Sequence, residues 1–391
     1  MFVIEDLLEK FNSGKLIASD SRLEKIETKQ IVLFGAGGIG KELYMVLMDK
    51  GINVFCFLDT VYCPDHNDEE IIKIGNYKVP VYNPNSKKLE NLKTEGYVIL
   101  SALFPHDIRN QVKGQLLKIG YKNVFALQEV NFSNLDSFYK LFHISNNYEK
   151  LIQTDKEKII KTYNLLESRQ DKDLYIEHIK AHLTKDFSEK KEPLGINLQY
   201  LAHDIPVEKD YSHFIDCGGF DGDTIKNFVS NGVSLNNIVI FEPQNDLNKK
   251  IKEFVTKNRE KFNSVTIFPC GVNSTTAKFK FSTSTTVPAS SVIDESGSDI
   301  IQCVAIDEVL FGFKPTFIKM DIEGAEVEAL KGAKETIIQY KPQLAISVYH
   351  SLSDLWEIPL LIKSFYSGYK FYLRNYNSMG LETVLYAFPE K

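Results

Sequence analysis

Phe214–Thr224, with the sequence FIDCGGFDGDT, joins a short apolar strand to a glycine-rich turn and then to a helical pattern. Ile31–Gly40, with the sequence IVLFGAGGIG, has the same design much earlier in the chain. Each segment opens an alternation of strands and helices, which is typical of parallel α/β sheets. Two such openings predict two α/β units rather than one long one.

The predicted fold class is therefore α/β, with two Rossmann-like domains joined by a helical connector. We place the first domain at residues 1–130, the connector at 131–209 and the second domain at 210–391. The connector has no strand signal, and its apolar residues recur at three- and four-residue spacing between charges.

Short apolar runs give the strands of both domains. Expected strands of the first domain are 31–34, 54–59, 97–101 and 124–127, with a helix over 109–119. The seven expected strands of the second domain are 214–217, 238–241, 265–268, 317–320, 344–348, 369–373 and 384–387, with an edge hairpin near 277–282. The last two should pair antiparallel, because the residues between them are too few for a crossover helix.

Composition narrows the class of protein. Of 391 residues, 43% are hydrophobic and 25% charged, which is ordinary for a globular chain. The net charge of −6 disfavours a general nucleic-acid binder. The five cysteines form no CxxC pair, and no apolar run approaches the ~20 residues of a spanning helix. We expect a cytoplasmic protein without membrane insertion or a nucleic-acid partner, and leave a homo-oligomer open.

The glycine turn of the second domain carries acids that indicate its ligand. Asp216, Asp221 and Asp223 flank the turn, and Glu242 ends the next strand. An acid at that strand tip can accept both hydroxyls of a ribose. Three acids repel phosphate, and the turn has no GK[ST], so a P-loop is disfavoured. They suit an ammonium or sulfonium group, and S-adenosylmethionine has both. The plain alternative is a tight turn with a surface Glu242.

A second group of ionisable residues falls at the same sheet edge. Asp321 and Glu323 follow the strand 317–320, and His350 follows the next strand. Methyl transfer to a hydroxyl benefits from a general base or from a cation that stabilises the alkoxide. His350 could be the base, or Asp321, Glu323 and His350 could hold a divalent cation such as Mg²⁺. The alternatives are a capping role for His350 and a helix N-terminal role for Glu326.

The second domain resembles the FkbM family of S-adenosylmethionine-dependent O-methyltransferases. The matching segments are FIDCGGFDGDT, IVIFEP, SSVIDESG, CVAIDEVL, FIKMDIEGAEVEALKGA, LAISVYHSLSDLWEIP and ETVLYAF. The resemblance implies cofactor contacts from Asp216, Gly218, Gly219, Asp221, Thr224 and Glu242. It implies an acceptor site at Asp321, Glu323 and His350. It also implies a sugar or nucleotide-sugar substrate in surface-polysaccharide biosynthesis. One departure is CGGFDG, where many members have GANIG.

The first domain carries a dinucleotide-type fingerprint. Gly35, Gly37 and Gly40 form GxGxxG between a strand and a helix, and Asp59 ends the next strand. No catalytic Tyr-x-x-x-Lys set follows. The segment resembles the small nucleotide-binding domain attached to some sugar-modifying transferases. Nucleotide-sugar binding, a structural or oligomerising role, and NAD(H) chemistry stay open.

The leading prediction is an S-adenosylmethionine-dependent O-methyltransferase that acts on a sugar hydroxyl. Two alternatives belong to other classes. One is a nucleotide-dependent oxidoreductase or epimerase run by the first domain, and the other is a non-catalytic scaffold that binds S-adenosylmethionine.

Overall fold

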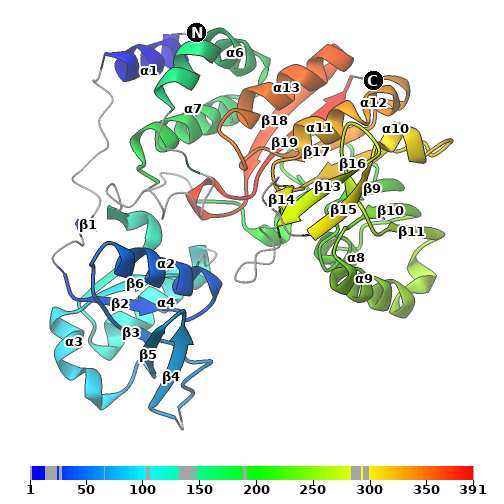
Figure 1. Ribbon diagram of the computed structural model, residues 1–391. Helices are drawn as coiled ribbons and strands as arrows, with labels where there is room; N and C mark the ends of the chain where they lie inside the picture. The colour runs from blue at the N-terminus through cyan, green and yellow to red at the C-terminus, as the bar shows by residue number, and fades with distance from the viewer. Residues whose placement is uncertain are drawn as a thin grey trace.

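The protein forms two large sheets, each with its own helices, and a group of helices beside the second sheet (Figure 1). The structure is a computed structural model that describes residues 2–13, 24–25, 29–65, 67–102, 106–131, 144, 148–187, 192–282, 292–293 and 299–390. None of the described helices has both the length and the apolar character needed to cross a bilayer.

The first sheet has six strands in the order β4-β5-β3-β2-β6-β7, and only β4 runs antiparallel to its neighbour. Its strands are β2 (Ile31–Phe34), β3 (Val54–Leu58), β4 (Glu69–Ile74), β5 (Tyr77–Tyr82), β6 (Tyr97–Leu100) and β7 (Asn123–Ala126). Its helices are α2 (Gly38–Asp49), α3 (Glu90–Glu95) and α4 (His106–Ile119), with 3-10 turns η1 (Lys87–Leu89) and η2 (Leu127–Glu129). A short parallel pair joins β1 (Glu24–Lys25) to β8 (Val130–Asn131).

The second sheet has seven strands in the order β11-β10-β9-β16-β17-β19-β18. They are β9 (His213–Cys217), β10 (Asn237–Phe241), β11 (Ser264–Phe268), β16 (Phe317–Met320), β17 (Gln343–Ser347), β18 (Tyr369–Asn375) and β19 (Thr383–Pro389). All are parallel except β19, which runs antiparallel between β17 and β18. Strand β18 therefore runs in the same direction as β17, so the loop that follows it lies at the carboxyl edge of the sheet.

Helices flank this second sheet, and a small sheet lies beside it. The helices are α8 (Asp223–Ser230), α9 (Asn245–Lys257), α10 (Ile306–Val309), α11 (Glu326–Lys331), α12 (Lys334–Tyr340) and α13 (Asp354–Phe365), with 3-10 turns η4 (Arg259–Lys261) and η6 (Ser378–Gly380). The small sheet has the order β12-β15-β13-β14, from β12 (Gly271–Val272), β13 (Ala277–Ser282), β14 (Val292–Ile293) and β15 (Asp299–Val304). Central strands such as β16 are buried on both faces, as expected of a parallel sheet covered by helices.

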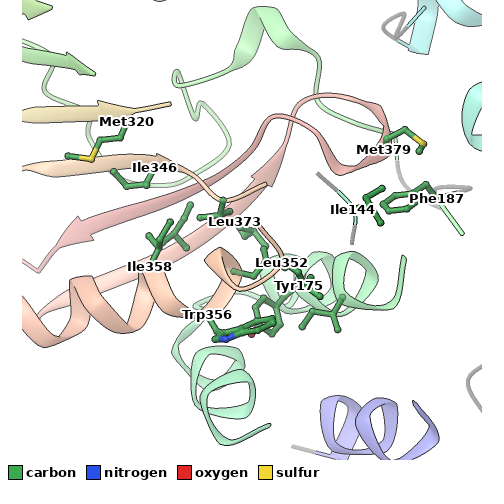
Figure 2. Packing of buried hydrophobic residues seen from close by; sticks show 14 of the residues in the cluster. Ile144, Tyr175, Phe187, Met320, Ile346, Leu352, Trp356, Ile358, Leu373 and Met379 are labelled. Atoms are coloured by element: carbon green, nitrogen blue, oxygen red, sulfur yellow. The ribbon is translucent and has the colours of Figure 1, made fainter. Parts of the chain in front are cut away.

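The connector supplies α6 (Glu149–Leu165), α7 (Arg169–Thr184) and the 3-10 turn η3 (Ile196–Leu198). Helix α6 packs on α13, and α7 packs on β18. Figure 2 shows Trp356 of α13 beside Tyr175 of α7, and the Trp356 Nε1–H donates to Asp155 of α6 over 3.0 Å. The N-terminal helix α1 (Phe2–Asn12) packs on α6 and α7 rather than on the first sheet (Figure 1).

The predicted α/β class and the seven-stranded sheet are confirmed, including the antiparallel pairing of the last two strands. Two expectations need correction. The hairpin β4–β5 was not expected, because β4 carries charged and mostly exposed residues. Ala277–Ser282 pairs in the small sheet and not at the edge of the large one. The boundaries at 130 and 209 stay predictions.

Candidate active site

A pocket of about 360 Å³ opens at the carboxyl edge of the second sheet. Residues that follow β9, β10 and β16 line it, which is where open α/β sheets bind ligands. Five of the predicted site residues line the pocket: Gly218, Thr224, Glu242, Asp321 and Glu323. Asp216, Gly219, Asp221 and His350 lie around it without lining it.

Asp216 is fully buried beneath the pocket, and its Oδ1 lies 3.0 Å from Nζ of Lys319 on the neighbouring strand β16. Lys319 also donates to the carbonyl oxygen of Gly218 over 2.6 Å. Burial raises the pKa of Asp216 to about 6. Burial also lowers the pKa of Lys319, but carboxylates led by Asp216 outweigh it and raise the pKa overall. The pair is ionised at neutral pH, so Asp216 is not a free charge for a ligand.

The other two acids of the turn, Asp221 and Asp223, do not both face a ligand as the sequence predicted. Asp221 Oδ1 lies 3.0 Å from Nζ of Lys226, so its charge is compensated at the surface. Asp223 lines the pocket at the start of α8 and accepts from the backbone N–H of Thr224 over 2.8 Å. Lysines thus compensate two of the three acids that suggested a cationic ligand, Asp216 and Asp221. The third, Asp223, faces the pocket and forms no salt bridge with a lysine among the described residues.

The glycines of the turn are required by packing within the protein. Gly218 has φ +81°, and a Cβ there would lie 1.9 Å from the carbonyl oxygen of Asp321. A Cβ on Gly219 would lie 2.3 Å from Cγ2 of Ile240. Neither position leaves room for a side chain, so the turn can press against β16 and β10 only with glycine. The close approach that we expected toward a ligand is made toward neighbouring strands.

Glu242 lies at the tip of β10, where an acid for a ribose was expected. Its two carboxylate oxygens accept from the backbone N–H groups of Phe220 (2.9 Å) and Gln244 (2.8 Å). Burial raises the pKa of Glu242 to about 7. These two bonds fix the carboxylate in the pocket wall and leave lone pairs for hydroxyl donors.

Asp321 is the centre of a hydrogen-bonded group on the other side of the pocket. Its Oδ2 accepts from the phenol of Tyr200 over 2.9 Å, and its Oδ1 accepts from the phenol of Tyr349 over 3.2 Å. Burial raises the pKa of Asp321, but Lys319 and His350 outweigh it and keep the pKa below its ordinary value. Asp321 is thus a fixed carboxylate at neutral pH.

His350 is buried among three carboxylates. Its Nδ1 lies 3.1 Å from Oε1 of Glu326, and its Nε2 lies 3.6 Å from both Asp321 Oδ1 and Glu323 Oε2. Burial lowers the pKa of His350, but these carboxylates, Glu326 first, outweigh it and raise the pKa to about 10. Burial likewise raises the pKa of Glu323 to about 8. The imidazole is protonated at neutral pH, which favours an electrostatic role over that of a base.

The comparisons with known proteins agree with this geometry. Residues 216–374 match the family model of the methyltransferase FkbM domain. We refer to this matched segment, residues 216–374, as the FkbM domain. A solved structure of a methyltransferase FkbM from Methylobacillus flagellatus KT is similar to 99% of this chain and to 100% of its own, with a TM-score of 0.66 and 18% identity. That likeness shows a shared fold over both units. No curated protein matches the sequence.

The FkbM domain does not build the whole pocket. Five lining residues lie outside 216–374, which we call the acceptor wall: Ile196, Gln199, Tyr200, Asn377 and Glu382. Gln199 Nε2 donates to Oε2 of Glu382 over 2.7 Å. Burial raises the pKa of Glu382 to about 7. Our sequence reasoning missed the whole wall.

The position of Glu382 in this wall could have been predicted from the sequence. Glu382 closes the loop after β18, and the predicted antiparallel pairing of the last two strands already places that loop at the carboxyl edge. No sequence pattern predicts the position of Gln199 and Tyr200, because they lie near the end of the connector and reach the pocket only through the tertiary fold. Lys319 also escaped notice, since it lies inside a strand that otherwise has an apolar pattern.

Three residues of the FkbM domain lie near enough to one another to hold a metal ion, and this set differs from the predicted one in a single residue. Among the described residues, Asp321, Glu326 and His350 place ligand atoms within 4.8 Å of one another. Glu323 is not part of that set. Glu326 is therefore more than a helix N-terminal acid, although its Oε1 does accept from the backbone N–H of Ile322 over 2.8 Å.

In the first unit, the fingerprint residues meet in one turn. Gly35 has φ +106°, and a Cβ on Gly40 would lie 2.0 Å from the carbonyl oxygen of Gly35. A Cβ on Gly37 would meet nothing within 4 Å. Asp59 Oδ2 accepts from the backbone N–H of Ala36 over 2.8 Å, and Oδ1 accepts from that of Val61 over 2.7 Å. Asp59 thus already holds the loop, and a nucleotide site here stays a prediction. Cys56, Cys63 and His66 come close together in the sequence after the fingerprint, and His66 lies outside the described residues.

Proposed function

We propose that this methyltransferase uses S-adenosylmethionine to methylate a hydroxyl oxygen of a sugar, nucleotide-linked or in a glycan of surface-polysaccharide biosynthesis. The observation that carries the proposal is the pocket of the FkbM domain, with Glu242 on one side and the Asp321 group on the other. The resemblance of the sequence to O-methyltransferases of this family supports oxygen as the acceptor atom.

The pocket residues fit the proposed cofactor. Glu242 has lone pairs to accept ribose hydroxyls, and Asp223 offers a carboxylate to an ammonium group. The Asp216–Lys319 pair and the turn around Gly218 fix the floor between them. When bound, S-adenosylmethionine supplies a methyl group on a positively charged sulfur, which an acceptor oxygen can take without prior activation of the methyl carbon.

The chain contributes positioning and a place for the hydroxyl proton. Orientation of two reactants in a site removes much of the entropic barrier to their reaction. Asp321, held by the phenols of Tyr200 and Tyr349, can accept a hydrogen bond from the acceptor hydroxyl. Because His350 is held protonated, we assign the proton to the carboxylates that face the pocket, and we assign stabilisation of their charge to His350.

A divalent cation is the alternative means of stabilising the alkoxide. Asp321, Glu326 and His350 would be its ligands, and His350 must lose its proton to coordinate. The proton and the cation therefore compete for one site. Activity that is lost in a chelator and restored by Mg²⁺ would support the cation, whereas full activity in the chelator would exclude it.

Methyl transfer is tested with isotopically labelled S-adenosylmethionine and a panel of nucleotide sugars and glycans. We expect label in a sugar ether for at least one acceptor. Asp321→Asn should lower the rate by at least about 100-fold, and exposed Asp246→Asn should not. Label in no acceptor, or an unchanged rate in Asp321→Asn, would contradict the proposal. Full function in an Asp321→Ala, His350→Ala double variant would favour the scaffold alternative.

A second candidate function belongs to the first unit. The open space at Gly37 favours nucleotide binding beside that glycine. Calorimetry with NAD and with a nucleotide sugar separates dehydrogenase-type from sugar-type binding, and Gly37→Glu should abolish either. The oxidoreductase or epimerase alternative requires that Asp216→Ala leave catalysis intact while Gly37→Glu abolishes it.

A further inference from the structure

The acceptor wall joins two chain segments that flank the FkbM domain. Gln199 donates to Glu382 over 2.7 Å and to the phenol oxygen of Tyr200 over 3.1 Å. Tyr200 in turn donates to Asp321 over 2.9 Å. One chain of hydrogen bonds thus runs from Glu382 to Asp321, the carboxylate that we placed beside the acceptor hydroxyl.

Two residues of the acceptor wall, Tyr200 and Glu382, have the positive φ that non-glycine residues rarely adopt. Among the described residues, four of the eight non-glycine residues with positive φ line the pocket: Tyr200, Phe220, Glu323 and Glu382. Such residues cost free energy and persist only where the surroundings fix them. Tyr200 is fixed on both sides, because its N–H donates to the phenol of Tyr386 and its carbonyl accepts from the phenol of Tyr211.

The charge of the pocket restricts what the wall can bind. Its described lining carries five carboxylates, from Asp223, Glu242, Asp321, Glu323 and Glu382, against one ammonium group. That ammonium group belongs to Lys319, which is already paired with Asp216. Asp321 is ionised at neutral pH, Glu242 and Glu382 with pKa values of about 7 are partly ionised, and Glu323 with a pKa of about 8 is mostly neutral. A phosphate or carboxylate placed here would meet this negative charge and no unpaired ammonium group among the described lining residues, which disfavours its binding.

Three helices begin at the pocket, because Asp223 of α8, Gln244 before α9 and Ala325 before α11 line it. A helix N-terminus attracts anions through its unpaired N–H groups. At α8 the first turn already holds the carboxylate of Asp223, which accepts from the N–H of Thr224. At α9 the N–H of Gln244 donates to the carboxylate of Glu242, and α11 begins with Glu326. An anionic ligand at any of these helix ends would meet a carboxylate of the protein.

We propose that the acceptor wall is a subsite for an uncharged or ammonium-bearing polyhydroxylated acceptor, whose hydroxyls bind Gln199 and Glu382, and that it rejects anionic sugars. This proposal rests on the proposed function, because the bound sugar is an acceptor only if methyl transfer takes place. It narrows the substrate class to neutral and amino sugars, with any phosphate held away from the methylated ring.

The test measures binding apart from turnover. Matched methyl glycosides of the gluco, galacto and manno series, each in neutral, 2-amino and uronic acid form, are titrated calorimetrically with S-adenosylhomocysteine present. The matched glycoside 6-phosphates are added as phosphate probes. At least one neutral or amino glycoside should bind, with the matched uronic acid and 6-phosphate at least about tenfold weaker.

Three variants assign the effect to the wall. Glu382→Lys should reverse the preference within the matched series, and Gln199→Ala should weaken the neutral glycoside about tenfold. Glu390→Lys makes the same charge change at an exposed position near the C-terminus and should change nothing. Unaltered affinity for S-adenosylmethionine in each variant shows that the pocket has folded.

The two proposals fail separately. Equal or tighter binding of a matched uronic acid or 6-phosphate, an unchanged preference in Glu382→Lys, or no binding by any neutral or amino glycoside would overturn the subsite. Absence of label transfer to glycosides that bind in the expected order would overturn methyl transfer and leave the subsite standing.

Discussion

His350 is a buried cation in a carboxylate cluster, and its proton sets the balance of charge there. Glu326, Asp321 and Glu323 surround it, and its pKa is raised to about 10. A histidine whose folded pKa lies above its unfolded value stabilises the protein fully below the unfolded pKa. That stabilisation is lost as the pH rises through the folded value.

His350→Gln should therefore be destabilising in a pH-dependent way. At pH 6.5 the variant leaves buried carboxylates without their cation, so it should lose about 3–5 kcal/mol of the free energy of unfolding. The gap to the wild type should narrow as the pH rises from 6.5 toward 10. Urea unfolding at several pH values measures it, and a gap that stays constant would contradict a protonated imidazole.

Lys319 is the matching cation beneath the pocket. Lys319→Met leaves the fully buried Asp216 uncompensated, so it should cost about 3–5 kcal/mol and weaken S-adenosylmethionine binding. Adding Asp216→Asn should restore part of the stability but not the binding, because the floor of the pocket has lost its polar contacts. Chemical unfolding and calorimetry on both variants separate the two effects, and equal stability of single and double variants would contradict a buried ion pair.

The glycine turn after β9 is the element that brings both halves of the site together. Its backbone lies against the end of β16, so that Gly218 faces the carbonyl oxygen of Asp321. The turn thus lies directly against the backbone of Asp321, the residue that carries the proposed acceptor carboxylate. A change at Gly218 moves both.

A pair of glycine variants tests this contact. Gly218 and Gly232 both have positive φ, but a Cβ at Gly232 meets nothing within 4 Å. Gly232→Ala should cost about 1 kcal/mol from the left-handed backbone alone. Gly218→Ala adds a clash with backbone and should cost more than about 3 kcal/mol and lower cofactor affinity. Similar losses of stability in the two variants would mean that packing is unimportant at Gly218.

Local pattern predicted those elements whose environment is simple. The seven strands of the second sheet are short apolar runs because helices or neighbouring strands cover them, and the pattern identifies them directly. Strands β4 and β15 carry exposed charged and polar residues, so they resemble loops in sequence. At the site, strand-tip acids such as Glu242 and Asp321 were predictable. The pairing of Asp216 with Lys319 was not, since it depends on which strands become neighbours.

At the scale of the whole molecule, one side chain links the first unit to the pocket. Arg109 of α4 donates to Oγ of Ser378 over 2.8 Å and to Glu192 over 3.0 Å. Ser378 follows Asn377 in the loop that ends at Glu382, and Glu192 precedes the segment with Gln199. The buried guanidinium thus contacts both segments that form the acceptor wall.

Arg109→Ala should therefore impair acceptor use more than cofactor use. We expect the KM for the acceptor to rise by about three- to tenfold, with kcat and the Kd for S-adenosylmethionine nearly unchanged. Lys113→Ala is a matched control, because Lys113 lies on the same helix but pairs with Glu129 inside the first unit. Equal effects of the two substitutions on the acceptor KM would contradict a positioning role for Arg109.

The packing of α1 changes the topological description of the chain. Because α1 lies on α6 and α7, the six-stranded unit is inserted between two segments that belong to one helical layer, and it is not a leading domain. Strands β1 and β8, which flank the unit in the sequence, pair with each other, so the two ends of the unit lie side by side. A deletion of residues 1–130 would also strip Ile4, Leu7 and Leu8 from that layer. Excision that keeps α1 and rejoins it ahead of α6 would preserve the layer.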